Sequence, residues 1–418
     1  MHEKIVLPGG LRLITEKMPH VRSVSIGVWL GSGSRHEGDA NHGISHFLEH
    51  MLFKGTESRT AKQIADSIEG RGGQLNAFTT KEHTCIHAKV LDEDLNLAID
   101  VLSDMILHSR FDPADVEKEK GVILEEIGAC RDVPDDFIHD LAARSAWPEH
   151  PLGRDILGTA ESVQSFSREM VVDEFQERYV KENALIVAVG NLSPARTAEA
   201  VENAFGAMHP GRFDSCADAP ELVPGRLFER RGTEQAHVCA VGPGTGASSE
   251  DFYALHVLCS ILGGTSGSRL FQKIREERGL AYSVYSYQST FADCGLLTVY
   301  VGTSPRHALE ALDAVFSEFD DIRGNGVTET EMESARAQAR GSLLLSLESS
   351  SARMVRLGKS EMMVGRPVTP EQVLERIEAV SIDQVRRVAA RALDPARAAL
   401  ASIGPSAVLP RWERAAGT

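Results

Sequence analysis

The chain of 418 residues lacks the features of several classes of protein. No apolar run approaches the length of a membrane span, and the opening MHEKIVLPGG has no basic segment followed by an apolar core. The formal net charge of −16 disfavours nucleic acid or an anionic membrane surface as a partner. We therefore expect no secretory signal, no nucleic-acid binding and no membrane association.

Cysteine is scarce, and its spacing shows neither a Cys-x-x-Cys pair nor a regular framework. The six residues are Cys85, Cys130, Cys216, Cys239, Cys259 and Cys294. This pattern is typical of buried free thiols in a reducing compartment, and the cytoplasm is the simplest location. A content of 42% apolar and 25% charged residues is that of a globular protein, long enough for two or three domains.

One stretch, residues 42–56 (HGISHFLEHMLFKGT), carries a pattern with chemical meaning. His46, Glu49 and His50 stand in the order His-x-x-Glu-His, the inverted form of a zinc motif. Offsets of three and four residues place the three side chains on one face of a helix. Two imidazoles one turn apart can bind one zinc ion, and the carboxylate between them can act as a general base toward water.

A catalytic zinc site needs a third protein ligand and keeps one position open. Residues 112–131 are expected to form a helix, because they carry a proline in the first turn and an apolar stripe. Glu119 and Glu126 lie within about 20° of each other beside this stripe, whereas Glu125 faces solvent. Geometry favours Glu126 or Glu119 as the ligand, with the other holding a ligand histidine. Without the two histidines, both acids would be the flank of an ordinary amphipathic helix.

The stretches HFLEHMLFKGT and VILEEI resemble the pitrilysin/insulinase family of zinc metallopeptidases, and the likeness runs along nearly the whole chain. It is greatest to the processing-peptidase branch, typified by the β subunit of the mitochondrial processing peptidase. The resemblance implies that His46, His50 and Glu126 bind one zinc ion per chain and that Glu49 is the general base. It also implies a catalytic-site role for Glu119. Manganese or cobalt would suit the same ligand types.

The resemblance further implies residues that contact a peptide substrate. Asn76 and Ala77 match positions on a sheet-edge strand beside the zinc, to which an extended peptide adds as a further strand. Asp136 and Asp140 stand one helical turn apart and match acids that recognise an arginine near the cleavage point. Two such carboxylates can pair with a guanidinium, although an exposed charged face explains these two acids equally well.

A glycine- and serine-rich loop, residues 263–268, precedes Arg275 and Tyr282. In the family, an arginine and a tyrosine with this spacing bind substrate and stabilise the reacting carbonyl. A guanidinium and a phenol are suitable donors to a developing oxyanion. The alternative is an arginine in a solvated charge cluster and a tyrosine in the core.

The second half of the chain weakly repeats the first, but its corresponding helix lacks the metal triplet. We therefore expect an α+β fold of two homologous α/β-sandwich domains, each a mixed or antiparallel sheet with helices packed on it, forming half of a clamshell. The expected parts are a zinc domain at 1–212, a polar linker at 213–226, and an inert domain at 227–418 that supplies the Arg/Tyr pair.

These expectations predict a zinc-dependent metalloendopeptidase that cleaves extended, unfolded or basic peptides inside a chamber. The chain resembles the short branch of the family, which closes the chamber by dimerisation, so we expect a homodimer. A heterodimer with an inert sister chain is the alternative assembly. The alternative functions are a non-catalytic relative, like the core subunits of the respiratory bc1 complex, and a zinc protein that binds peptides without cleaving them.

Overall fold

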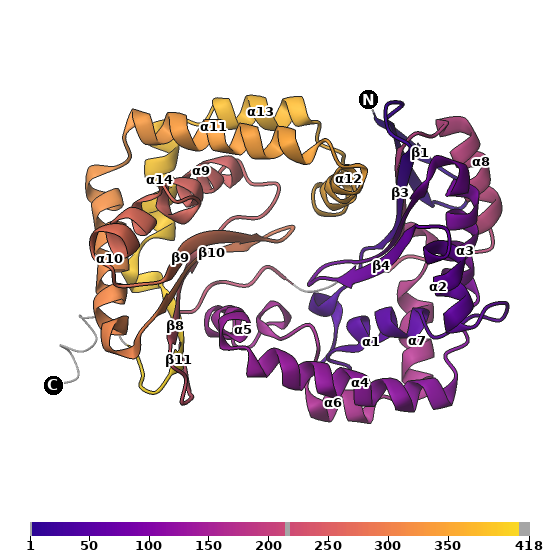
Figure 1. The fold of residues 1–418 in the computed structure, drawn as a ribbon, viewed down its shortest axis with the longest axis horizontal. Helices are drawn as coiled ribbons and strands as arrows, with labels where there is room; N and C mark the ends of the chain where they lie inside the picture. The colour runs from indigo at the N-terminus through magenta and orange to yellow at the C-terminus, as the bar shows by residue number, and fades with distance from the viewer. Residues whose placement is uncertain (1, 214–217, 409–418) are drawn as a thin grey trace. The chain divides into compact units, whose positions relative to one another are not determined.

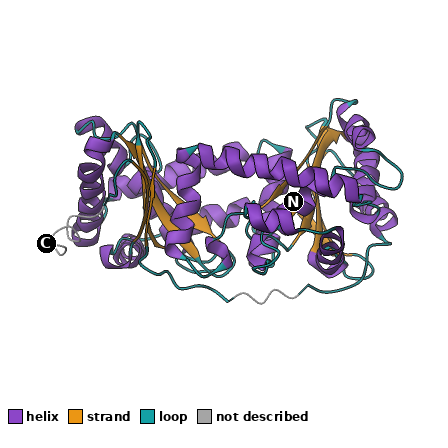
Figure 2. Cartoon of the chain, turned by 90° about the horizontal axis from the view of Figure 1, so that it is seen from below, coloured by secondary structure: helices purple, strands orange, loops and turns teal. Residues whose placement is uncertain are grey.

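A computed structural model describes residues 2–213 and 218–408 of the chain (Figure 1). The contacts divide it into two compact units, each assembled from separate stretches. The first unit comprises Met1–Gly128, Asp155–Ala217 and Ser346–Val368, and the second comprises Ala129–Arg154, Asp218–Leu345 and Thr369–Thr418. In each unit, helices cover the strands of one sheet (Figure 2).

The first unit is built on a six-stranded sheet in the order β1-β2-β6-β3-β5-β4. Its strands are β1 (His2–Val6), β2 (Arg12–Lys17), β3 (Ser23–Leu30), β4 (Gln74–Thr79), β5 (Thr84–Leu91) and β6 (Ala184–Gly190). The neighbours β2 and β6 are parallel, and the other neighbours are antiparallel. The central strands β3 and β6 are almost wholly buried, as expected for strands covered on both faces. Strand β4 forms one edge of this sheet.

The helices of the first unit pack on both faces of its sheet. They are α1 (Ile44–Leu52), α2 (Ala61–Glu69), α3 (Leu95–Leu107), most of α4 (Pro113–Asp132), α6 (Ala160–Ser165), α7 (Arg168–Arg178), α8 (Pro194–Phe205) and α12 (Ser350–Val364). The main core lies between the sheet and helices that include α1 and α3. On the other face, α12 packs Met354 and Leu357 against Trp29 and Val187.

The second unit has a five-stranded sheet in the order β7-β11-β8-β10-β9. Its strands are β7 (Arg226–Arg230), β8 (Ala236–Pro243), β9 (Ser283–Thr290), β10 (Gly295–Thr303) and β11 (Ala399–Gly404). The neighbours β7 and β11 are parallel, and the other pairs are antiparallel. Its helices are α5 (Pro134–Ala146), α9 (Phe252–Gly263), α10 (Ala308–Asn325), most of α11 (Glu329–Ser346), α13 (Pro370–Glu378) and α14 (Ile382–Ala392), with a π-helical segment at Phe271–Glu277.

Short 3-10 turns complete the described elements. They lie at Ser34–His36, Asp92–Asp94, Pro151–Gly153, Lys181–Asn183, Pro305–His307 and Pro395–Arg397. Within residues 2–213 and 218–408, each helix is too short or too polar to serve as a membrane span. Cys85, Cys239 and Cys259 are buried free thiols, whereas Cys130 and Cys294 are only partly buried, so the prediction of buried thiols is wrong for these two. Cys216 lies outside the described residues.

Two helices pack away from their sequence neighbours. Helix α5 comes from the first half of the chain but belongs to the second unit, and α12 comes from the second half but belongs to the first unit. Helix α5 lies on β8 and β11 through Phe137, Ile138 and Leu141, and α12 lies on β3 and β6. The mixed α/β architecture with two sheets confirms the predicted fold class. The predicted parts, 1–212 and 227–418, follow the chain and stay a prediction, and part of the predicted linker, 214–217, lies outside the described residues.

Candidate metal centre

Helix α1 presents the predicted triplet because its apolar residues are drawn into the core. Phe47 and Leu48 have no exposed surface and Met51 is 1% exposed, which fixes the helix against the sheet. The helix begins after Gly43, whose φ of +93° favours glycine. His46, Glu49 and His50 therefore project from one rigid element.

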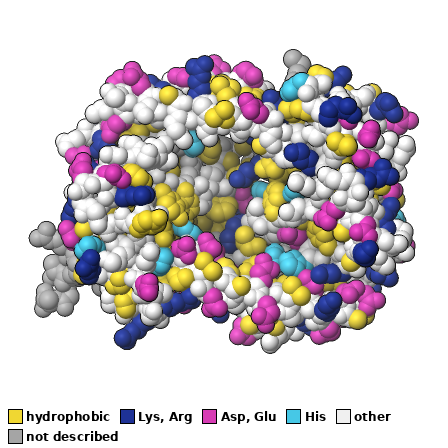
Figure 3. All heavy atoms as spheres, in the orientation of Figure 1, with side chains coloured by type: hydrophobic (Ala, Val, Ile, Leu, Met, Phe, Trp, Pro, Cys, Tyr) yellow, Lys and Arg dark blue, Asp and Glu magenta, His cyan; other side chains and the backbone are white. Residues whose placement is uncertain are grey.

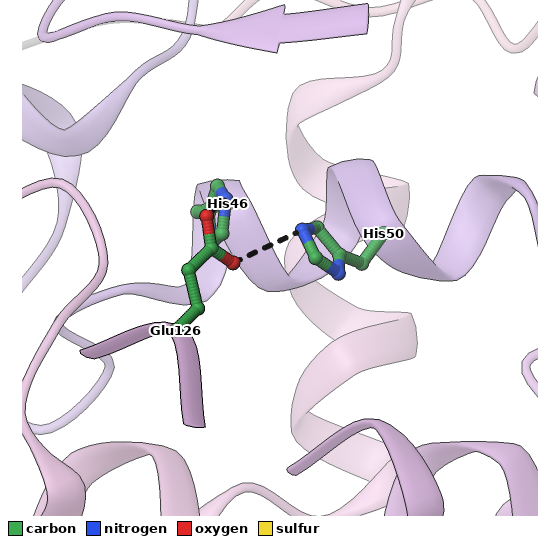
Figure 4. Close-up of side chains that lie close together, drawn as sticks. All are labelled: His46, His50 and Glu126. Atoms are coloured by element: carbon green, nitrogen blue, oxygen red, sulfur yellow. Dashed lines mark ion pairs between the residues drawn. The ribbon is translucent and has the colours of Figure 1, made fainter. Parts of the chain in front are cut away.

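The ligand atoms of His46, His50 and Glu126 converge on one point, as Figure 4 shows. Glu126, on α4, places Oε1 3.8 Å from His46 Nε2 and Oε2 3.6 Å from His50 Nε2. Donor atoms about 2.0–2.2 Å from a tetrahedral zinc lie about 3.3–3.6 Å apart. The three groups thus have the donor types that a zinc ion requires, Glu126 lies close to that spacing from both histidines, and all three ligand atoms lie within 4.8 Å of one another. Among the described residues, no other group of three His, Cys, Asp or Glu side chains has such spacing.

Glu119 lies on the other side of His50. Its Oε1 is 2.7 Å from His50 Nδ1, and its Oε2 is 2.5 Å from Lys54 Nζ, with the residue 1% exposed. Burial alone would raise the pKa of Glu119, but the hydrogen bonds from His50 and Lys54 outweigh it and lower that pKa. An anionic Glu119 accepts a hydrogen bond from His50 Nδ1. Burial alone would lower the pKa of His50, but the hydrogen bond and charge of Glu119 outweigh it and raise that pKa. In the neutral tautomer that keeps its proton on Nδ1, the Nε2 lone pair is available to a metal ion.

His46 is fixed differently. It is 8% exposed, and its Nδ1 has no hydrogen-bond partner among the described residues. Burial, and then the charge of His50, lowers the pKa of His46 to about 4. A neutral imidazole is the form that binds metal ions.

Glu49 is oriented by a residue of the neighbouring sheet. Thr79, at the end of β4, donates a hydrogen bond of 2.6 Å from its hydroxyl to Glu49 Oε2. Burial raises the pKa of Glu49, although Thr79 opposes this shift. A carboxyl group with a raised pKa is suited to take up a proton and return it in the same reaction.

Asn76 and Ala77 lie on β4, the edge strand that also carries Thr79. Ala77 is opposite Ile86 of β5, and its N–H donates to the Asn76 side-chain oxygen at 2.8 Å. The structure therefore places both predicted contact residues on a sheet edge, in the same unit as the three candidate ligands.

The other predicted residues belong to the second unit. Asp136 and Asp140 lie on α5. Arg275 lies in the π-helical segment, with its guanidinium carbon 4.7 Å from the centre of the Phe271 ring and 5.4 Å from that of Tyr282. Tyr282 is 76% exposed. The tyrosine is thus not in the core, and its ring lies beside the Arg275 guanidinium. The substrate-binding role of the pair stays a prediction.

The sequence analysis missed Lys54 and Thr79. Lys54 follows His50 by four residues, so its helical spacing offered a signal for contact with the same carboxylate. Thr79 gave no such signal, because its contact with Glu49 depends on how β4 and α1 pack.

Comparison with known proteins identifies the family. The family model described as Insulinase (Peptidase family M16) matches residues 12–160, and that described as Peptidase M16 inactive domain matches residues 165–339. The uncharacterized zinc protease YmxG of Bacillus subtilis (strain 168) is 42% identical over 410 residues, which cover 98% of this chain and all of that one. The chain therefore belongs to the insulinase family of peptidases, M16.

Solved structures share the fold at low sequence identity. The peptidase M16 inactive domain from Pseudomonas fluorescens has a TM-score of 0.90 and 20% identity, and the match covers 98% of this chain and 100% of that one. A chain of complex III from Candida albicans has a TM-score of 0.84 and 20% identity, with 96% of both chains covered. Both likenesses concern the fold alone.

Proposed function

We propose that this protein is a zinc-dependent metalloendopeptidase of the processing-peptidase branch. The observation that carries the proposal is the convergence of His46, His50 and Glu126, with Glu49 on the same helix face as the histidines. Two imidazoles, one carboxylate and a nearby proton acceptor are the groups that zinc-dependent hydrolysis requires. The name of the Bacillus subtilis relative, a zinc protease, agrees with this activity.

The proposed reaction divides the work among the site residues. One zinc ion per chain, held by His46, His50 and Glu126, would supply Lewis acidity toward the peptide carbonyl. Glu49 takes the proton from the attacking water and later delivers it to the leaving amine. Glu119 keeps His50 in the tautomer whose Nε2 can bind the metal.

The proposed substrate is an extended, unfolded peptide with basic residues. Strand β4, which carries Asn76 and Ala77, is an edge strand of the sheet that the described residues form, and a peptide can add to such an edge through main-chain hydrogen bonds. Asp136 and Asp140 are the proposed partners of a substrate arginine. Arg275 and Tyr282 are the proposed donors to the reacting carbonyl oxygen.

The proposed assembly is a homodimer that encloses the substrate in a chamber, with each chain forming half of a clamshell. Both the candidate zinc ligands and the Arg/Tyr pair occur in one chain, so two identical chains would be self-sufficient. A heterodimer with an inert sister chain is the second assembly. We propose the cytoplasm as its location, from the cysteine pattern described above.

A non-catalytic role like that of the respiratory core subunits is the second candidate function. The likeness to a chain of complex III and the match to the inactive-domain model support it. That model, however, matches residues 165–339, whereas His46 to Glu126 fall within the insulinase match at 12–160. A zinc protein that binds peptides without cleaving them is the remaining alternative.

Substitution Glu49→Gln tests the proposal. We expect the variant to bind about one zinc ion per chain, like the wild type, because the ligands are untouched. We expect its kcat on unfolded arginine-containing peptides to fall by about 100- to 10,000-fold, because the general base is lost. Metal analysis and mass spectrometry of the cleaved peptides measure the two effects. Equal cleavage by both proteins would refute the mechanism, and zinc without cleavage by either would favour a binding role.

A further inference from the structure

The first turn of α1 is held by a carboxylate that lies outside the zinc motif. The N-cap residue Gly43 has no side chain to accept the N–H groups that a helix leaves unpaired at its start. Glu37 accepts them instead, with Oε2 2.7 Å from Gly43 N and Oε1 2.8 Å from Ser45 N. A carboxylate at this end of a helix is also favoured by the helix dipole.

Glu37 is enclosed, and a buried arginine braces the same turn. Glu37 and Arg178 are each 3% exposed. Arg178, the last residue of α7, donates to the Ser45 hydroxyl at 3.3 Å and to the Ser32 hydroxyl at 3.2 Å. It also pairs with Glu174. Burial raises the pKa of Glu37, and the hydrogen bonds from Gly43 and Ser45 and the charge of Arg178 oppose this shift. Carboxylate and guanidinium thus hold the residue that directly precedes His46.

The two candidate histidine ligands differ in what fixes them. His50 is held at Nδ1 by Glu119, at 2.7 Å. His46 Nδ1 has no hydrogen-bond partner among the described residues. The position of His46 therefore depends on packing and on where the first turn of α1 lies, which Glu37 controls through the backbone.

We infer that Glu37, braced by Arg178, is a positioning residue for the metal centre: it fixes the first turn of α1 so that His46 meets the ion. The inference rests on the proposed zinc site. In this inference, Glu37 supports His46 through the first turn of α1, as Glu119 supports His50 through a direct hydrogen bond. Glu37 does not touch the metal or the substrate.

Zinc affinity of Glu37→Gln, measured by competition with a chromophoric chelator, tests the inference. The amide keeps the size of the side chain but replaces one acceptor oxygen by a donor facing an N–H group. We expect zinc to bind about 10-fold more weakly, the scale typical of residues that support metal ligands. The stability toward urea should also fall, because a buried hydrogen bond is lost.

Glu361→Gln is the matched control. Glu361 is 2% exposed in the same unit, on the sheet face covered by α12, and pairs with Lys4 at 2.7 Å and Arg12 at 3.2 Å. Its substitution should lower stability without changing zinc affinity. If Glu37→Gln and Glu361→Gln both bind zinc within about 3-fold of the wild type, Glu37 is only a structural residue and the inference fails.

Arg178→Lys provides a second variant if Glu37→Gln does not fold. It keeps the positive charge, but one ammonium replaces the two guanidinium nitrogens, of which Nη1 reaches Ser45 and Ser32 and Nη2 reaches the His36 carbonyl and Glu174. Zinc binding more than about 3-fold weaker supports the inference, and a smaller change overturns it.

These affinities are measured without substrate, so the inference and the proposed function can fail separately. A wild type that cleaves no peptide, with weakened zinc binding in Glu37→Gln, would refute the function and keep the positioning role. Cleavage by the wild type, with unchanged zinc affinity in Glu37→Gln and Arg178→Lys, would support the proposed function and refute the positioning role of Glu37.

Discussion

At the scale of single residues, a metal centre depends on groups that never touch the ion. His50 is the clearest case, because Glu119 accepts its Nδ1 proton and Lys54 neutralises the charge of that carboxylate. When His50 is neutral with its proton on Nδ1, the lone pair of Nε2 is available to a metal ion, and Glu126 Oε2 lies 3.6 Å from that nitrogen. Removing Glu119 would leave His46, His50 and Glu126 in place but would free the His50 ring to change its orientation.

We therefore expect Glu119→Gln to weaken zinc binding by about 10- to 100-fold, since the amide cannot hold the imidazole proton as a carboxylate does. Chelator competition measures the change. The control is Glu125→Gln on the same helix, whose side chain is exposed and should not affect affinity. Equal affinities for the two variants would show that Glu119 does not support the site.

The sequence predicted the residues of the metal centre where their contacts follow from spacing within one helix. His46, Glu49 and His50 follow from helical spacing alone, and Glu119 and Glu126 from the same rule applied to α4. The choice between these two acids stayed open because it depends on how α4 lies against α1. Thr79 and Glu37 were missed, since both contacts depend on tertiary packing.

At the scale of elements, α12 approaches its sheet closely because small residues face it. Ser25 hydrogen-bonds the hydroxyls of Ser350 and Ser351, each at 2.9 Å. A Cβ at Gly358 would lie 2.2 Å from Cε2 of Trp29, a ring with no exposed surface. Position 358 thus requires glycine because the Trp29 ring leaves no room for a Cβ atom, and not because of its backbone conformation.

We expect Gly358→Ala to lower the free energy of unfolding by about 1–3 kcal/mol, because the added methyl group overpacks the interface with Trp29. Urea denaturation followed by circular dichroism measures this change. Gly341→Ala in α11 is the control, since its Cβ would meet no atom within 4 Å. It should be neutral or stabilising by up to about 1 kcal/mol. Two equally stable variants would contradict the close contact.

The placement of α5 and α12 shows where sequence reasoning ended at this scale. Each is an amphipathic helix whose apolar side fits any apolar sheet face of similar size. Nothing in their periodicity distinguishes a sheet formed by the same half of the chain from one formed by the other half. The choice is made by side-chain shape, such as Gly358 against Trp29.

At the scale of the whole molecule, the chain carries a formal net charge of −16. Acidic and basic side chains are interspersed over the face seen in Figure 3. Such a surface attracts basic peptides weakly from a distance, and salt screens this attraction.

We expect kcat/KM for an arginine-containing peptide to fall several-fold when ionic strength rises from about 0.01 to 0.15 M, as the Debye length shrinks from about 30 to 8 Å. The same peptide with citrulline in place of arginine is the control and should respond less. Steady-state cleavage rates for both peptides provide the comparison. An equal response would argue against a preference for basic substrates.

The placement of α5 and α12 also determines what a fragment of this chain would lack. A fragment of residues 1–212 would leave Trp29 and Val187 without Met354 and Leu357 of α12, and would carry α5 without β8 and β11. Its complement would have the opposite defect. Although the family models match the two halves separately, each half taken alone would leave one apolar sheet face without the helix that covers it.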